Sequence, residues 1–179
     1  MNRHIGTMAF LLALILGHGD IGSADTYLSQ QDTKGDILTQ EEAFIVTTLN
    51  QAADAESNFY STKDAASVLR FYAQDYAGIR DGKSETLSGK SKYLAEVLEQ
   101  IVRGDPVWIS SKVKNIKPSV EGRFGWATYE YEYQIGRSGG KSGGLQQVSQ
   151  EHCTAIFRKQ ADAWLIRHEH CSSTSSTPF

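Results

Sequence analysis

Residues 40–60 place apolar side chains at the three- and four-residue spacing of one helix face. Thr39 followed by Glu42 has the spacing of a capping box, which predicts that this helix begins at about residue 40. The stripe contains a carboxylate, Glu56, and burying an isolated charge is costly. We therefore expect Glu56 to have a partner or to face a cavity. The full stripe consists of Ile45, Leu49, Ala52, Ala53, Glu56, Phe59 and Tyr60.

Two more helices are predicted before the pattern changes. A short one, capped by Ser61 or Thr62, aligns Ala65, Val68, Leu69 and Tyr72. Residues 76–79 then read as extended, and Asp81-Gly82 predicts a hairpin turn. The third helix begins at Ser88 and ends at Gly104. Its apolar row is Leu94, Val97, Leu98, Ile101 and Val102.

From Val107 onward the period becomes two, which predicts long strands at 107–120, 123–135, 145–159 and 164–172. Residues 138–144 are a glycine-rich connection. A phosphate-binding loop would lie between a strand and a helix, whereas here another strand follows, so we do not expect phosphate binding. Helices followed by antiparallel strands predict one α+β domain over residues 39–173, with a disordered tail at 174–179.

The N-terminal segment predicts export. Residues 1–24 combine a basic start, an apolar run and a small-residue end, which predicts a signal peptide cleaved near Ala24 and a periplasmic or secreted protein. The apolar run is too short to span a bilayer, so we expect no stable membrane insertion. Residues 25–38 are polar and without a period, as in a flexible linker.

Charge and cysteine content bear on the class of partner and on the oxidation state of the cysteines. The net charge of −3 does not suit a nucleic-acid partner, so we expect none. The two cysteines, Cys153 and Cys171, would meet an oxidising compartment after export, where a disulfide can form. Two free thiols on a sheet face are equally consistent with the sequence.

Candidate chemistry gathers on the last strand. Alternation puts Trp164, Ile166, His168 and His170 on one face, and a turn at 160–162 would bring His152 opposite His170. Three imidazoles at one end of a sheet can bind polar groups or transfer protons near neutral pH. They can equally be a hydrogen-bonded structural set, and their spacing would also permit zinc.

The closing pattern W-x-I-x-H-x-H-x-S at 164–172, the run 69–75 and Leu87-Ser88-Gly89 resemble the SnoaL-like branch of the nuclear transport factor 2-like superfamily. The closing motif is also similar to that of the association domain of calcium/calmodulin-dependent kinase. This resemblance covers about residues 41–173. It implies a cone-shaped, curved antiparallel sheet whose pocket is enclosed by the three N-terminal helices, with no metal or cofactor and with homodimers formed through the sheet. Members include isomerases, dehydratases, cyclases, binders and assembly domains, so the fold does not settle the function.

The resemblance also bears on individual residues. It implies that Tyr72 contributes a hydroxyl to the pocket wall. The base and tyrosine positions of ketosteroid isomerase fall near Arg80 and Glu56, and neither residue type matches, so that chemistry is not expected. Similarity to the association domain favours an inward row of Trp126, Glu130 and Glu132, with the tyrosines between them on an outer dimer face. Simple hydrophobicity favours the reverse.

We therefore expect the protein to bind a small, partly apolar molecule in the pocket. The predicted ligand-binding residues are Tyr72, Trp126, Glu130, Glu132, His152 and Trp164. The alternative is a cofactor-independent isomerase, dehydratase or cyclase that uses His168, His170 and Glu56 as acid and base groups. A second alternative is a structural oligomerisation module with a filled cone.

Overall fold

The computed structural model describes residues 37–103, 107–137 and 144–178. The predicted signal peptide, nearly all of the predicted linker, the helix end at Gly104 and the glycine-rich connection lie outside the described residues. The remaining predictions can be compared with the structure element by element.

The three predicted helices are present: α1 (Gln40–Thr62), α2 (Ala65–Leu69) and α3 (Leu87–Val102), with two strands between α2 and α3. The capping box at the start of α1 is confirmed, with both reciprocal bonds between Thr39 and Glu42 present. The cap of α2 is Asp64 rather than Ser61 or Thr62. Within the described residues, no helix combines the length and apolar character needed to cross a membrane.

Six strands form one mixed sheet: β1 (Tyr72–Arg80), β2 (Lys83–Thr86), β3 (Val107–Glu121), β4 (Phe124–Arg137), β5 (Gly144–Gln160) and β6 (Ala163–Pro178). Their order is β2-β1-β6-β5-β4-β3, and the β1–β6 pair is parallel while the others are antiparallel. Tyr72, expected in the second helix, begins β1. Residues 174–178 of the predicted tail instead belong to β6, because Pro178 pairs with Gln147 of β5.

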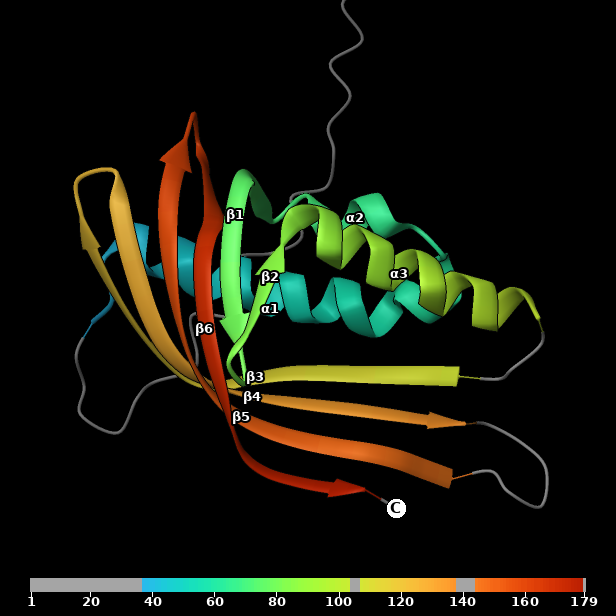
Figure 1. The fold of residues 1–179 in the computed structure, drawn as a ribbon. Coiled ribbons are helices and arrows are strands. Elements are labelled where there is room, and N and C mark those ends of the chain that lie inside the picture. The colour runs from blue at the N-terminus through green and yellow to red at the C-terminus, as the bar shows by residue number, and fades with distance from the viewer. Residues whose placement is uncertain (1–36, 104–106, 138–143, 179) are drawn as a thin grey trace, which may run out of the picture.

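The long strands β3 to β6 curve strongly, and the helices cover the concave face of the sheet (Figure 1). This is the α+β cone expected from the sequence. The main core lies between α1 and the sheet, where Ile45 and Phe157 have no exposed surface. A smaller apolar cluster, which includes Phe59 and Val68, joins α1, α2 and α3 to β3. Helices and sheet together therefore leave space only where polar side chains interrupt these two clusters.

A β-bulge in β6 reverses the direction of its side chains. Ile166 pairs with Phe157, but His168 pairs with Ile156, so Arg167 is an extra residue opposite the β5 strand. Trp164 and Ile166 are buried before the bulge, and the buried residues after it are Glu169 and Cys171. Because side-chain direction has a period of two, one inserted residue sends His168 and His170 to the outer face.

Gly125 of β4 packs closely against Ile45 of α1. A methyl group there would lie 2.4 Å from Cδ1 of the fully buried Ile45 and 3.2 Å from the Ser119 carbonyl oxygen. We expect Gly125→Ala to lower the free energy of unfolding by about 1–3 kcal/mol through overpacking. Urea denaturation measures the change.

The matched control is Gly89→Ala in α3, where a methyl group meets only Thr86 Oγ1 at 3.4 Å. Alanine favours the helix, so this variant should be neutral or slightly stabilised. Equal stabilities for the two variants would show that the Ile45 side chain can move aside without lowering the free energy of unfolding.

Candidate functional site

A cavity of about 710 Å³ lies between the helices and the sheet, as the cone architecture predicts. Its apolar wall consists of Val68, Leu94 and Ile109, and its aromatic wall of Tyr93, Tyr131 and Tyr133. The remaining lining residues are Glu56, Arg80, Asp81, Glu85, Lys90, Ser149, Glu151 and Ser173. An apolar and an aromatic wall facing several convergent polar groups are typical of a small-molecule site.

Arg80, the last residue of β1, is held on one side of the cavity by two carboxylates. Its Nη1 lies 2.7 Å from Glu151 Oε2 and its Nη2 lies 3.4 Å from Glu169 Oε2. The guanidinium also stacks over the Tyr131 ring, 5.2 Å from the ring centre. Burial opposes the charged form, but Glu169, with Tyr131 and Glu151, keeps the pKa of Arg80 above its ordinary value.

Lys90 of α3 continues this charged network. Its Nζ lies 3.0 Å from Glu85 and 4.0 Å from Glu169, and 4.6 Å from the centre of the Tyr72 ring. Glu169 is therefore shared between Arg80 and Lys90. Three carboxylates and two cations form one connected set that links α3 to β1, β2, β5 and β6.

Tyrosine hydroxyls complete the hydrogen bonding of these carboxylates. Tyr129 donates to Glu169 Oε1, and Tyr76 donates to Glu85 at 2.8 Å. Burial, reinforced by Glu169, raises the pKa of the Tyr129 hydroxyl well above its ordinary value. These phenols therefore remain protonated donors at physiological pH.

Glu151 behaves differently from its neighbours. Burial raises the pKa of its carboxyl group, even though Arg80 and the Ser149 hydroxyl both favour the charged form. The Ser149 hydroxyl donates to Glu151 Oε1 at 3.1 Å. Burial thus favours the protonated form of Glu151.

Glu56 both faces the cavity and has partners, as its place on an apolar stripe predicts. Its Oε2 accepts hydrogen bonds from Tyr131 at 2.5 Å and from the Ser111 hydroxyl at 3.0 Å. Burial, with Glu56 nearby, raises the pKa of the Tyr131 hydroxyl well above its ordinary value. Among the described residues, no lysine or arginine lies within ion-pair distance of Glu56.

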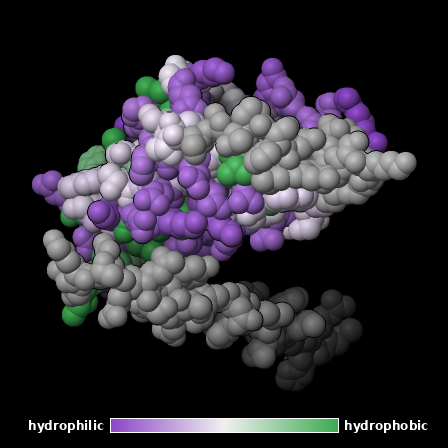
Figure 2. All heavy atoms as spheres, turned by 90° about the horizontal axis from the view of Figure 1, so that it is seen from below, coloured by the Kyte–Doolittle hydropathy of each residue, from purple (hydrophilic) through white to green (hydrophobic). Residues whose placement is uncertain are grey.

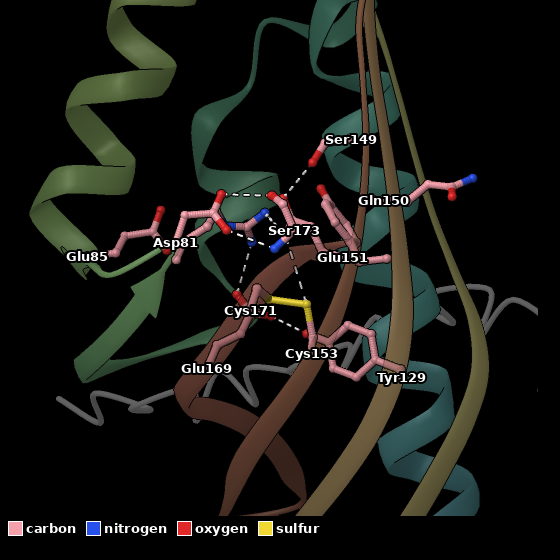
Figure 3. Close-up of a disulfide and its surroundings, with 12 residues drawn as sticks. Asp81, Glu85, Tyr129, Ser149, Gln150, Glu151, Cys153, Glu169, Cys171 and Ser173 are labelled. Carbon is pink, nitrogen blue, oxygen red and sulfur yellow. Dashed lines mark hydrogen bonds and ion pairs between the residues drawn. A yellow bond between two sulfur atoms is a disulfide. The ribbon is translucent and has the colours of Figure 1, made fainter. Parts of the chain in front are cut away.

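A disulfide joins Cys153 of β5 to Cys171 of β6, directly across the strand pair. This settles the alternative that the sequence left open. The bridge is buried beside Glu151 and Tyr129 (Figure 3). In the described part of the chain, Glu151 and these two cysteines are the group of three candidate metal ligands, and bonded sulfurs cannot act as thiolates.

Of the residues predicted for the site, Glu56 lines this cavity. Tyr72 and Trp164 are buried in the core, 6% and 3% exposed, and neither is among the lining residues. The indole of Trp164 donates to Glu41 Oε2 at 2.7 Å, which ties β6 to the start of α1. The pocket-wall role expected for Tyr72 is therefore wrong, because its ring packs beneath Lys90.

The predicted inward histidines are wrong. His152 and His170 are exposed and His168 is half-buried, all on the outer face of the sheet. The β6 bulge accounts for His168 and His170. His152 alternates with Glu151 and Cys153, which point inward.

The inward row of β4 is also the reverse of the one favoured above. Tyr129 and Tyr131 are buried, whereas Trp126 is 43% exposed and Glu130 is exposed. The alternative from simple hydrophobicity, which places the tyrosines inward, is the correct one, because the tyrosine rings fill the concave face of the sheet. Glu130, Glu132 and His152 instead border a separate, polar depression of about 240 Å³.

Several cavity residues were not predicted from the sequence, chiefly Lys90, Tyr131 and Glu151. The base and tyrosine positions of ketosteroid isomerase were expected near Arg80 and Glu56, and both of these residues line the cavity. The positions of these two residues in the chain were the signal that could have identified them as cavity residues. Sequence reasoning set that signal aside because the residue types differ from those of ketosteroid isomerase.

Comparison with known proteins places the fold. A structure of hexachlorocyclohexane dehydrochlorinase (LinA, type 2) aligns with a TM-score of 0.56 and 7% identity, covering 74% of this chain and 87% of that one. An NTF2-like protein of unknown function from Prochlorococcus sp. NATL2A aligns with a TM-score of 0.54 and 16% identity, covering 78% and 97%. A domain from Xanthomonas campestris, named after the association domain of calcium/calmodulin-dependent protein kinase II, has a TM-score of 0.53, 17% identity and coverage of 74% and 88%.

At these identities the structural likeness shows the fold alone. A search of curated proteins finds no match. The family model of the SnoaL-like domain matches residues 46–176, which span α1 to the end of β6. The chain therefore belongs to the SnoaL-like domain family.

Proposed function

We propose that this protein binds a small, partly apolar organic molecule in the cavity between its helices and its sheet. The observation that carries this proposal is the cavity itself, about 710 Å³ in volume, within the range of small-molecule sites. Its apolar end at Val68, Leu94 and Ile109 would hold the carbon skeleton of a ligand. Its polar end, with Glu56 and Arg80, would orient the polar groups.

A pair of neighbouring serines in β6 provides the test. Ser173 lines the cavity and hydrogen-bonds Asp81, whereas Ser172 pairs with His152 on the outer face. We expect Ser173→Trp to fill the cavity mouth with its indole and to abolish ligand binding. Ser172→Trp should bind as the unchanged protein does.

Binding can be measured by thermal denaturation against a library of partly apolar small molecules. A ligand that binds only the folded state raises Tm. At a concentration of a hundred times its Kd, it stabilises the folded state by about 2.7 kcal/mol. Such shifts should occur in the unchanged protein and in Ser172→Trp. A shift that survives in Ser173→Trp would place the ligand elsewhere.

An enzymatic role is the second candidate, and Glu56 is the observation that favours it. Two hydroxyl donors hold one of its oxygens in place, so the carboxylate is oriented toward the cavity as a general base would be. His168 and His170 are not part of this proposal, since they lie on the outer face. Turnover of a bound ligand that Glu56→Gln abolishes would favour the enzyme over the binder.

We also propose that the protein acts outside the cytoplasm. The buried Cys153–Cys171 disulfide supports this, because such bonds persist in oxidising compartments. Mass spectrometry of the protein from its native source should find a mature N-terminus near residue 25. A retained Met1 would contradict export with cleavage.

We propose a homodimer formed through the outer face of the sheet. Trp126 and Ile156, paired across β4 and β5, are 43% and 41% exposed there. Seen from below (Figure 2), the coloured surface is mainly hydrophilic, with scattered hydrophobic residues. We place the contact at the exposed Trp126 and Ile156 pair. Sedimentation should give twice the monomer mass, and Trp126→Glu should give the monomer.

A further inference from the structure

The charges that line the cavity do not balance. Four lining residues are carboxylates, Glu56, Asp81, Glu85 and Glu151, whereas Arg80 and Lys90 are the cations among the described lining residues. Both cations are already paired within the network, which adds the buried Glu169. The surplus of negative charge persists even with a proton on Glu151, so the cavity favours positive charge on a ligand.

Within this surplus, Glu56 is the carboxylate available to a ligand. Hydroxyl groups supply its described hydrogen bonds, and the Arg80 guanidinium acts on it only through space, without an ion-pair contact among the described residues. Glu85 and Glu151, in contrast, contact Lys90 and Arg80 directly. A positively charged ligand would supply the direct ion-pair contact that Glu56 lacks among the described residues.

The surroundings of Glu56 suit an organic cation rather than a bare one. Ser111, which donates to Glu56, lies two residues along β3 from Ile109 of the apolar wall, so both side chains face the same way. The rings of Tyr131 and Tyr133, stacked with centroids 6.4 Å apart, adjoin the same space. Aromatic faces attract ammonium groups, and the apolar wall would bury an attached hydrocarbon.

We propose that the cavity selects organic amines, with the protonated nitrogen paired to Glu56 and the hydrocarbon part against Val68, Leu94 and Ile109. This proposal rests on the proposed binding function and specifies its ligand class. The probes are three molecules with the same skeleton and different charge: 2-phenylethylamine, 2-phenylethanol and phenylacetate. Isothermal titration calorimetry at pH 7 on the full chain measures their affinities.

We expect the amine to bind at least about ten times more tightly than the alcohol, and phenylacetate to bind most weakly. Glu56→Gln should weaken amine binding by about tenfold or more and should weaken alcohol binding less, because the alcohol carries no charge to pair with the carboxylate. The control is Glu96→Gln on the exposed side of α3, which removes the same charge outside the cavity and should change neither affinity.

The probe series on the unchanged protein needs no variant, so it stands even if Glu56→Gln folds poorly. An alcohol or phenylacetate affinity equal to that of the amine would overturn the selection for cations while leaving the binding function intact. An unchanged amine affinity in a folded Glu56→Gln variant would overturn the pairing. Loss of all binding to every probe and to the wider library would reject both proposals.

Discussion

Arg80→Met is expected to lower the free energy of unfolding by about 3–5 kcal/mol, because it leaves two buried carboxylates without their main cation. Glu151 and Glu169 are 5% and 6% exposed, and both contact the Arg80 guanidinium. Methionine keeps much of the aliphatic volume, so the loss reports on charge rather than on packing. Urea denaturation at pH 8, followed by circular dichroism, measures it.

The defect should shrink as the pH falls. A buried carboxyl group without a cation has a folded-state pKa above its unfolded value, so the stabilising protonated form exists at low pH and is lost as the pH rises through the folded pKa. Glu151 already shows this direction in the unchanged protein, since burial raises its pKa. The difference between Arg80→Met and the unchanged protein should therefore be smaller at pH 5 than at pH 8.

Arg103→Met is the matched control. The Arg103 side chain is 72% exposed at the end of α3 and pairs with Glu99, itself 68% exposed. An exposed pair of this kind contributes about 0.5 kcal/mol or less. A comparable loss in the two variants, or a loss in Arg80→Met that does not depend on pH, would contradict the assigned role of Arg80.

Reduction of the Cys153–Cys171 disulfide is expected to cost about 3 kcal/mol of stability, the loop-entropy value for a closed loop of this size. The two cysteines are separated by 18 positions in the sequence. Guanidinium denaturation with and without dithiothreitol measures the loss. A thiol assay should detect no free thiol in the native protein and two after reduction.

Cys153→Ala with Cys171→Ala provides the control for the reductant. This double variant should be destabilised by a similar amount and should no longer respond to dithiothreitol. Both cysteines are buried between the charged network and the core, so a small packing loss adds to the effect. Full stability of the reduced protein would show that strand pairing alone holds β5 to β6.

Local pattern was sufficient for the three helices and the four long strands, but not for β1 and β2. The capping box at Thr39 and Glu42, the apolar stripe of α1 and the period-two strands are properties of neighbouring residues, and each was confirmed. Family resemblance supplied the cone, and the SnoaL-like domain model covers the same region. The capping box, the apolar stripe and the strand period depend on residues a few positions apart, so they can be identified from the sequence directly.

The side of the sheet on which each group lies was decided by tertiary structure. One extra residue, Arg167, turns the histidines of β6 outward and Glu169 inward. The local pattern does not indicate the bulge, because a bulge is defined by how one strand pairs with another. A period-two argument fails completely beyond such a point, since every later side chain changes face.

The sequence by itself determined that this protein has three helices before a long antiparallel meander. It also determined that Glu56, a charged residue on an apolar helix face, has a partner or faces a cavity. Only the tertiary structure brought Arg80, Glu151 and Glu169 together, because they come from three strands whose pairing includes a parallel contact between β1 and β6. Long-range pairing of this kind is set by how the whole sheet bends around its core, and no short segment encodes it.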